Sequence, residues 1–177
     1  KILFAASEAV PFMKTGGLAD VTGSLPKYFD KKNYDVRVIL PKYVCMEERW
    51  KGQLHFLCHF YVNLSWRKQY VGIFETTYDG ITYYLVDNEF YFAGNAPYNN
   101  IYEDVEKFAF FSKAVLEALP YLDFCPDIIH CHDWQTGLLP VFLRTLYGDE
   151  EYYTGIKTVF SIHNLKFQGR WKLPAVM

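Results

Sequence analysis

The sequence has no dense run of basic residues, no long hydrophobic run and no paired cysteines. Its 177 residues include 18 Lys and Arg against 20 Asp and Glu, a formal net charge of −2, so nothing in the charge pattern supports binding to nucleic acid or to an anionic membrane. No apolar run approaches the roughly 20 residues that a membrane-spanning helix needs. The first residues, Lys1–Phe4, carry no signal-peptide pattern. We therefore expect no nucleic-acid partner and no membrane partner.

The cysteines are few and scattered. Four are present, without any CxxC spacing, at positions 45, 58, 125 and 131. This disfavours a zinc site, and four cysteines are too few for a disulfide scaffold, so we expect a reduced, cytoplasmic setting. Hydrophobic residues make up 51% of the chain, which excludes a disordered tail. The length suits one domain that buries roughly 70% of its unfolded surface.

Strand-like and helix-like segments alternate along the chain. Short apolar runs predict buried strands, and apolar residues at helical spacing predict helices. The expected order is a strand at 1–7, a helix over Leu18–Phe29 bent at Pro26, a strand at Val36–Leu40, a helix marked by apolar residues from Val105 to Leu119, a strand at Asp127–Cys131, a helix at Thr136–Tyr147 with Pro140 near its first turn, and a strand at Lys157–Ile162. This alternation predicts an α/β fold, a Rossmann-like and mostly parallel sheet flanked by helices.

Three consecutive strand-like segments interrupt that alternation. Residues 53–66, 69–77 and 81–86 are rich in Tyr, Phe, Val, Ile and Thr, and Asp79–Gly80 is a strong hairpin turn signal. We expect an antiparallel hairpin excursion or extension of the sheet here. Residues 87–102 then form a loop too long to be a mere connector, and thus a candidate binding loop.

A Gly-Gly pair lies between the first strand and the first helix. Gly16 and Gly17 have no Cβ to keep a ligand from the backbone, and the helix start offers unpaired N–H groups that favour anions. Lys14 adds a positive charge beside them. The arrangement suggests a site for a phosphorylated ligand, although a plain tight connection is the alternative. The segment fits neither the Walker pattern nor the spaced-glycine dinucleotide pattern.

Polar residues follow three of the expected strands. In an open parallel sheet, ligands bind beyond the carboxyl ends of the strands. We expect these ends to bring to one rim the residues Lys14, Gly16, Gly17, Asp20, His130, His132, Asp133, His163 and Asn164.

Five of these residues also have a structural interpretation, whereas His163, where a strand ends and a polar turn begins, is expected to have a site role. His130 lies within a strand and is expected to be a core or supporting histidine, whereas His132 is open between a structural hydrogen bond and a site role. Asp133 and Asp20 each suit a helix N-cap, which does not exclude facing a ligand. Lys14, taken alone, is an ordinary exposed lysine.

The histidines also raise a metal hypothesis. His130, His132, Asp133 and His163 carry groups that bind zinc or iron. Binuclear hydrolases, however, usually have a further histidine after the aspartate, where this chain has Trp134. We therefore expect no metal.

Four motifs together resemble one enzyme family. In the family's order, the motifs are Lys14–Val21 (KTGGLADV), Asp35–Pro41 (DVRVILP), Asp127–Trp134 (DIIHCHDW) and Thr158–Gly169 (TVFSIHNLKFQG). This combination resembles the glycogen and starch synthases, glucosyltransferases that use a nucleotide sugar, and the motifs span nearly the whole chain.

The resemblance implies a role for individual residues. Lys14 is similar to the lysine that contacts the nucleotide sugar, and Gly16 and Gly17 to the glycines that give access to its diphosphate and glucose. His163 resembles the histidine against the transferred glucose, where its ring bonds a hydroxyl and its backbone carbonyl supports the charge at the anomeric carbon. Asp133 and Asp20 resemble residues that position donor and acceptor, and Tyr98 a tyrosine of the same cleft, while Asn164 is expected to bind substrate. Phe167 stands where many relatives carry Tyr, which puts one contact in doubt.

The implied reaction is retaining transfer of glucose from ADP-glucose to the non-reducing end of an α-1,4-glucan, with no cofactor. The family has two Rossmann domains of the GT-B type, so residues 1–177 are expected to be a single incomplete N-terminal domain, without the C-terminal domain that supplies further cationic groups. No closing helix is expected in residues 170–177. Three alternatives remain: another GT-B glycosyltransferase, such as a sucrose-type synthase; a metal-dependent hydrolase; and a non-catalytic module that binds a nucleotide sugar or a glucan. The isolated chain is expected to be inactive.

Overall fold

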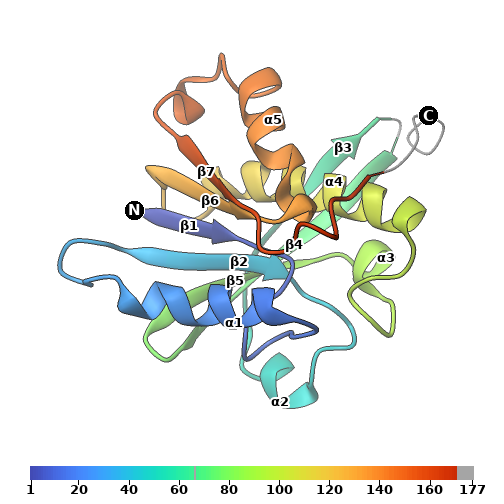
Figure 1. Ribbon diagram of the computed structural model, residues 1–177. Helices are drawn as coiled ribbons and strands as arrows, with labels where there is room; N and C mark the ends of the chain where they lie inside the picture. The colour runs from blue at the N-terminus through green and yellow to red at the C-terminus, as the bar shows by residue number, and fades with distance from the viewer. Residues whose placement is uncertain (66, 171–177) are drawn as a thin grey trace.

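The computed structural model describes residues 1–65 and 67–170, so the expectation for 170–177 lies almost wholly outside the described residues. One seven-stranded sheet, in the order β3-β4-β5-β2-β1-β6-β7, forms the centre of the molecule (Figure 1). The strands are β1 (Ile2–Ala5), β2 (Val36–Pro41), β3 (His55–Leu64), β4 (Arg67–Tyr78), β5 (Ile81–Asp87), β6 (Ile128–His132) and β7 (Lys157–Ser161).

Five strands are parallel and two are antiparallel. β5, β2, β1, β6 and β7 pair in parallel, whereas β3 pairs antiparallel with β4 and β4 with β5. Asp79 and Gly80 both have positive φ, 55° and 73°, as a tight hairpin between twisted strands needs. The α/β fold, the mostly parallel sheet and the hairpin excursion are thus confirmed.

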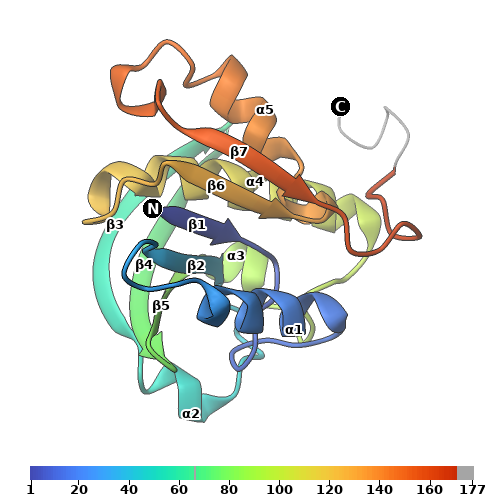
Figure 2. The same cartoon turned by 60° about the vertical axis from the view of Figure 1, so that its left-hand side comes forward.

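Helices cover both faces of the sheet. The helices are α1 (Gly17–Ser24), α2 (Glu48–Lys51), α3 (Glu89–Phe92), α4 (Ile101–Ala118) and α5 (Leu138–Thr145), with 3-10 turns η1 (Leu25–Tyr28), η2 (Leu119–Tyr121), η3 (Trp134–Thr136) and η4 (Glu151–Tyr153). Figure 2 shows α1 on one side of the sheet and α4 and α5 on the other. In β1, Leu3 packs into the α4 side of the core and Phe4 into the opposite side, because successive side chains point to opposite faces. Among the described residues, no helix has the length and apolar character needed to cross a membrane.

Several helix boundaries differ from those expected from the sequence. The α-helical part of the first helix ends at Ser24 and continues as a 3-10 turn, because Pro26 has no N–H to donate. The expected loop at 87–102 contains α3, whose first turn is capped by the Asn88 side chain accepting from Tyr91 N at 2.9 Å. α4 begins at Ile101, where the Asn100 side chain accepts from two backbone N–H groups. The helix expected over 136–147 is α5, preceded by η3.

Candidate functional site

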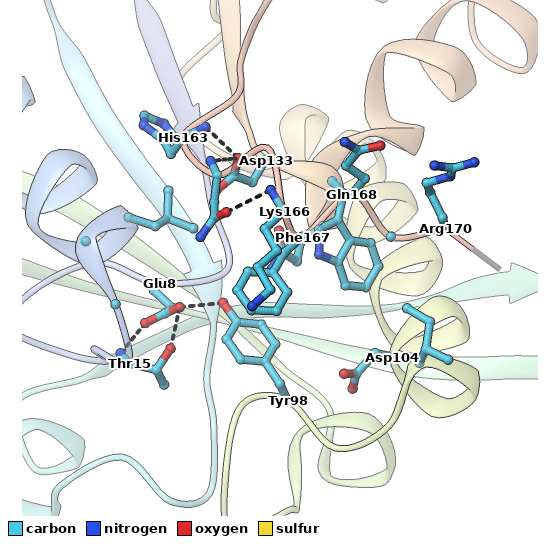
Figure 3. Close-up of a pocket in the computed structure, with 18 of the residues that line it drawn as sticks. Glu8, Thr15, Tyr98, Asp104, Asp133, His163, Lys166, Phe167, Gln168 and Arg170 are labelled. Carbon is cyan, nitrogen blue, oxygen red and sulfur yellow. Dashed lines mark hydrogen bonds between the residues drawn. The ribbon is translucent and has the colours of Figure 1, made fainter.

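A cavity of about 970 Å³ opens at the carboxyl ends of β1, β6 and β7 (Figure 3). Four segments line it: the loop between β1 and α1, the loop before α4, the turn after β6, and the segment that follows β7. Of the residues expected at the site, the lining includes Gly16, Gly17, Tyr98, Asp133, His163 and Asn164. Because parallel strands end at one edge of the sheet, segments from both ends of the sequence, from Glu8 to Arg170, meet there.

The Gly-Gly turn presents open backbone to this cavity. α1 begins at Gly17, its N-cap Gly16 is extended, and no side chain caps the helix start. A Cβ built on either glycine meets no atom within 4 Å. The first turn of a helix carries backbone N–H groups without intrahelical partners and a partial positive charge. The turn therefore offers an anion direct access to backbone donors.

Glu8 ties this turn to the loop before α4. Glu8 is only 3% exposed. Its carboxylate accepts hydrogen bonds from the Thr15 backbone N–H, from the Thr15 hydroxyl at 2.8 Å and from the Tyr98 hydroxyl at 2.5 Å. The Tyr98 hydroxyl also bonds the Ser7 hydroxyl at 2.8 Å. Burial, followed by the charge of Glu8, raises the pKa of Tyr98 well above its usual value, so the phenol stays protonated.

Sequence reasoning did not identify Glu8 as a site residue. The available signal was a carboxylate three residues after Ala5, where the buried strand β1 ends, in a loop without other acidic residues before Asp20. The expectation that 87–102 contains a binding loop is supported by the placement of Tyr98 and Asn99 in the cavity lining.

Asp133 holds the turn that follows β7. Its carboxylate accepts from the backbone N–H of His163 at 2.7 Å and from that of Asn164 at 3.4 Å, and the residue is 7% exposed (Figure 3). Its own φ is +59°, in the left-handed region that residues with a side chain rarely adopt. Asp133 occupies the N-cap position of η3, but its side chain does not cap that turn. The N-cap interpretation is therefore wrong for its side chain, which bonds a neighbouring segment instead.

Three imidazoles follow one another next to this turn. His132 Nδ1 lies 2.8 Å from His163 Nε2, and His130 Nε2 lies 2.7 Å from the Ser161 hydroxyl. His132 is fully buried, and burial together with His130 and His163 lowers its pKa to about 3. Burial and then His163 lower the pKa of His130. His132 is thus neutral at physiological pH and takes the structural hydrogen bond that the sequence left open.

Lys14 and Asp20 lie outside the cavity lining. The lysine ammonium and the carboxylate form an ion pair at 2.7 Å, with side chains 53% and 54% exposed. Asp20 lies in the first turn of α1, whose N-cap is Gly16, so its N-cap interpretation is wrong. The structure thus brings the glycines, Asp133 and His163 to one cavity but leaves this pair beside it. Among the described residues, the cationic side chains that line the cavity are Lys166 and Arg170, which were not selected from the sequence.

The histidines bond one another and Ser161, while Asp133 bonds backbone N–H groups. Among residues 1–65 and 67–170, no three His, Cys, Asp or Glu side chains gather closely enough to hold a metal ion. The hydrolase hypothesis therefore gains no support from the geometry of the described residues.

Comparison with known proteins gives a consistent result. The sequence profile of a family described as "Starch synthase catalytic domain" matches residues 1–176. The glycogen synthase of Lachnoclostridium phytofermentans is 67% identical over 171 residues, which cover 97% of this chain and 36% of that protein. The glycogen synthase of Lachnospira eligens is 61% identical over 175 residues, covering 99% of this chain and 37% of the relative.

A solved structure is similar as well. The catalytic domain of Starch Synthase IV from Arabidopsis thaliana, bound to ADP and acarbose, superposes with a TM-score of 0.87 at 28% identity. The match covers 99% of this chain and 36% of the Arabidopsis chain. The chain therefore spans about a third of the length of the curated relatives that it matches.

Proposed function

The chain belongs to the starch synthase catalytic domain family, and on that basis we propose that it forms part of the active site of a glucosyltransferase. The complete enzyme transfers glucose, with retention of configuration, from ADP-glucose to the non-reducing end of an α-1,4-glucan. The ADP bound to the similar Arabidopsis domain supports an adenine nucleotide sugar as the donor, and its acarbose supports a glucan acceptor.

One observation carries this proposal: the open Gly16–Gly17 turn shares a cavity with Asp133 and His163. Transfer from a nucleotide sugar leaves a diphosphate with growing negative charge and an anomeric carbon with growing positive charge. Backbone N–H groups at a helix start stabilise the first. The backbone carbonyl of His163 supports the second, and the hydrogen bonds from its N–H group and that of Asn164 to Asp133 fix this turn.

In this proposal Lys14 and Asp20, which lie beside the cavity, reach the substrates only after their ion pair opens. Their ion pair is half exposed, and such a pair is worth about 0–1 kcal/mol, so it opens at little cost. Lys14 then turns toward the diphosphate, and Asp20 toward donor or acceptor. Tyr98 and Asn164, which both line the cavity, complete the substrate contacts.

We also propose that residues 1–177 are one incomplete domain and that a C-terminal domain of the same polypeptide completes the active site. The apolar side chains Val159, Phe160 and Ile162 on and after the edge strand β7 are 45%, 43% and 60% exposed, which supports their being covered by further chain. The four free cysteines fit a reducing compartment and support a cytoplasmic location.

The test is glucose transfer by the full-length polypeptide that contains this chain. Glycogen is incubated with radiolabelled ADP-glucose or UDP-glucose, and the labelled product is digested with an exo-acting α-1,4-glucosidase. We expect incorporation from ADP-glucose in excess of that from UDP-glucose, with the label released by the glucosidase. Absence of incorporation from either donor would refute the function, and clear incorporation by residues 1–177 alone would refute the requirement for a second domain.

A further inference from the structure

The hydrogen bond between the two imidazoles of His132 and His163 constrains where their protons lie. The two nitrogens are 2.8 Å apart, the ring centroids are 5.1 Å apart and the ring planes differ by only 13°. The rings therefore lie edge to edge and nearly coplanar, so that one proton between the nitrogens lies along both in-plane lone pairs. The only ring nitrogen that His163 has left for a ligand is Nδ1.

The surroundings of His132 decide which ring donates. His132 is neutral, so only one of its nitrogens carries a proton. Its Nε2 is buried and has no hydrogen-bond partner among the described residues. If Nε2 carried the proton, an N–H group would be buried without a partner, which is rarer in folded proteins than an unpaired acceptor. The proton therefore belongs on Nδ1, which donates to His163 Nε2.

We propose that His132 is a positioning residue that fixes His163 as its Nδ1–H tautomer, so that the site presents the Nδ1–H group as a hydrogen-bond donor to a sugar hydroxyl. The identity of the ligand rests on the proposed function, whereas the tautomer rests on the hydrogen-bond geometry and on the burial of His132. A proton on His163 Nε2 would place two N–H groups against each other across 2.8 Å.

Backbone contacts fix His163 at the same time. Its N–H group donates to Asp133 at 2.7 Å, while its ring is held by His132. Because residues 132 and 133 are consecutive, the end of one strand orients both the carbonyl and the ring of the residue that faces the glucose. His130, two residues earlier, bonds Ser161 and not His163, so it serves as the matched control.

The experiment reads the tautomer directly by NMR of the full-length polypeptide labelled with ¹⁵N-histidine, with a His163→Asn sample to assign the resonances. At neutral pH we expect Nδ1 of His163 to resonate as a protonated nitrogen and Nε2 as an unprotonated one. The reverse pattern, or an average of the two, would overturn the proposal. If the full-length polypeptide showed the predicted protonation of Nδ1 but transferred no glucose, the proposed function would be refuted and the proposed tautomer would stand.

Two variants separate positioning from mere packing. His132→Asn keeps a short donor near the position of Nδ1, so we expect the Nδ1–H pattern and most of the kcat to remain. His132→Leu removes the donor, so we expect a mixed or Nε2–H pattern and a fall in kcat of at least about tenfold. His130→Asn should leave the pattern unchanged. If His132→Leu kept the Nδ1–H pattern, the proposal would be overturned, and if it failed to fold, the wild-type and His132→Asn spectra still decide.

Discussion

Replacing Gly17 by alanine is predicted to lower activity without lowering stability. The added Cβ meets no protein atom within 4 Å, and Gly17 is the first residue of α1 with no left-handed φ. Glycine in a helix costs roughly 0.5–1 kcal/mol relative to alanine, so the free energy of unfolding should stay constant or rise by about that amount.

The effect on the ligand has the opposite sign. In the proposed complex the diphosphate lies against the Gly17 backbone, where a methyl group would push it from hydrogen-bond distance. Loss of one hydrogen bond to a charged group costs about 1.5–3 kcal/mol, which corresponds to a fall in kcat/KM of about 10- to 150-fold. Steady-state kinetics with ADP-glucose and thermal unfolding of the full-length polypeptide measure the two quantities.

Gly155→Ala is the matched control, because a Cβ at Gly155 also meets nothing within 4 Å but lies outside the cavity lining. We expect wild-type kcat/KM for this variant. Wild-type kinetics for Gly17→Ala would show that no ligand approaches this backbone, and an unfolded Gly17→Ala protein would contradict the steric argument.

Three further predictions concern the network around the cavity. Tyr98→Phe removes the 2.5 Å hydrogen bond to the buried carboxylate of Glu8, so the free energy of unfolding in urea should fall by about 1–3 kcal/mol, and an unchanged midpoint would contradict it. Lys14→Gln should raise the KM for ADP-glucose about tenfold while leaving the unfolding midpoint in place, since the exposed pair with Asp20 adds at most about 1 kcal/mol; a normal KM would remove Lys14 from the donor site. Folding lowers the pKa of His132 from 6.5 to about 3, so between pH 6.5 and pH 3 the unfolded chain binds a proton that the folded chain does not. The free energy of unfolding should therefore fall as the pH drops through this range, by at most about 1.4 kcal/mol per pH unit. In urea titrations, His132→Asn should make the free energy of unfolding depend less on pH. A pH dependence equal to that of the wild type would show that a residue other than His132 takes up the proton.

The arrangement of strands could be predicted because its signals are local. Val36–Pro41 is a short apolar run, and Asp79–Gly80 is a turn that only a few residue pairs form readily, so both read directly from neighbouring residues. The convergence of Asp133 and His163 followed from one topological rule, since parallel strands end at the same edge of the sheet.

Contacts between distant side chains could not be predicted in the same way. Glu8 and Tyr98 are 90 positions apart, and their bond depends on how the loop before α4 folds back over the first loop. Lys14 was predicted from the sequence to be a site residue, but nothing in the sequence indicated that its ammonium forms an ion pair with Asp20, six positions later. Likewise, the spacing of His132 and His163 gave no indication that their rings form a hydrogen bond.

The most direct test of the central claim is a crystal structure of the full-length polypeptide with ADP. The account predicts diphosphate oxygens within hydrogen-bond distance of the backbone nitrogens at Gly16 and Gly17, in the cavity lined by Asp133 and His163. ADP bound elsewhere, with that turn facing only solvent, would contradict it.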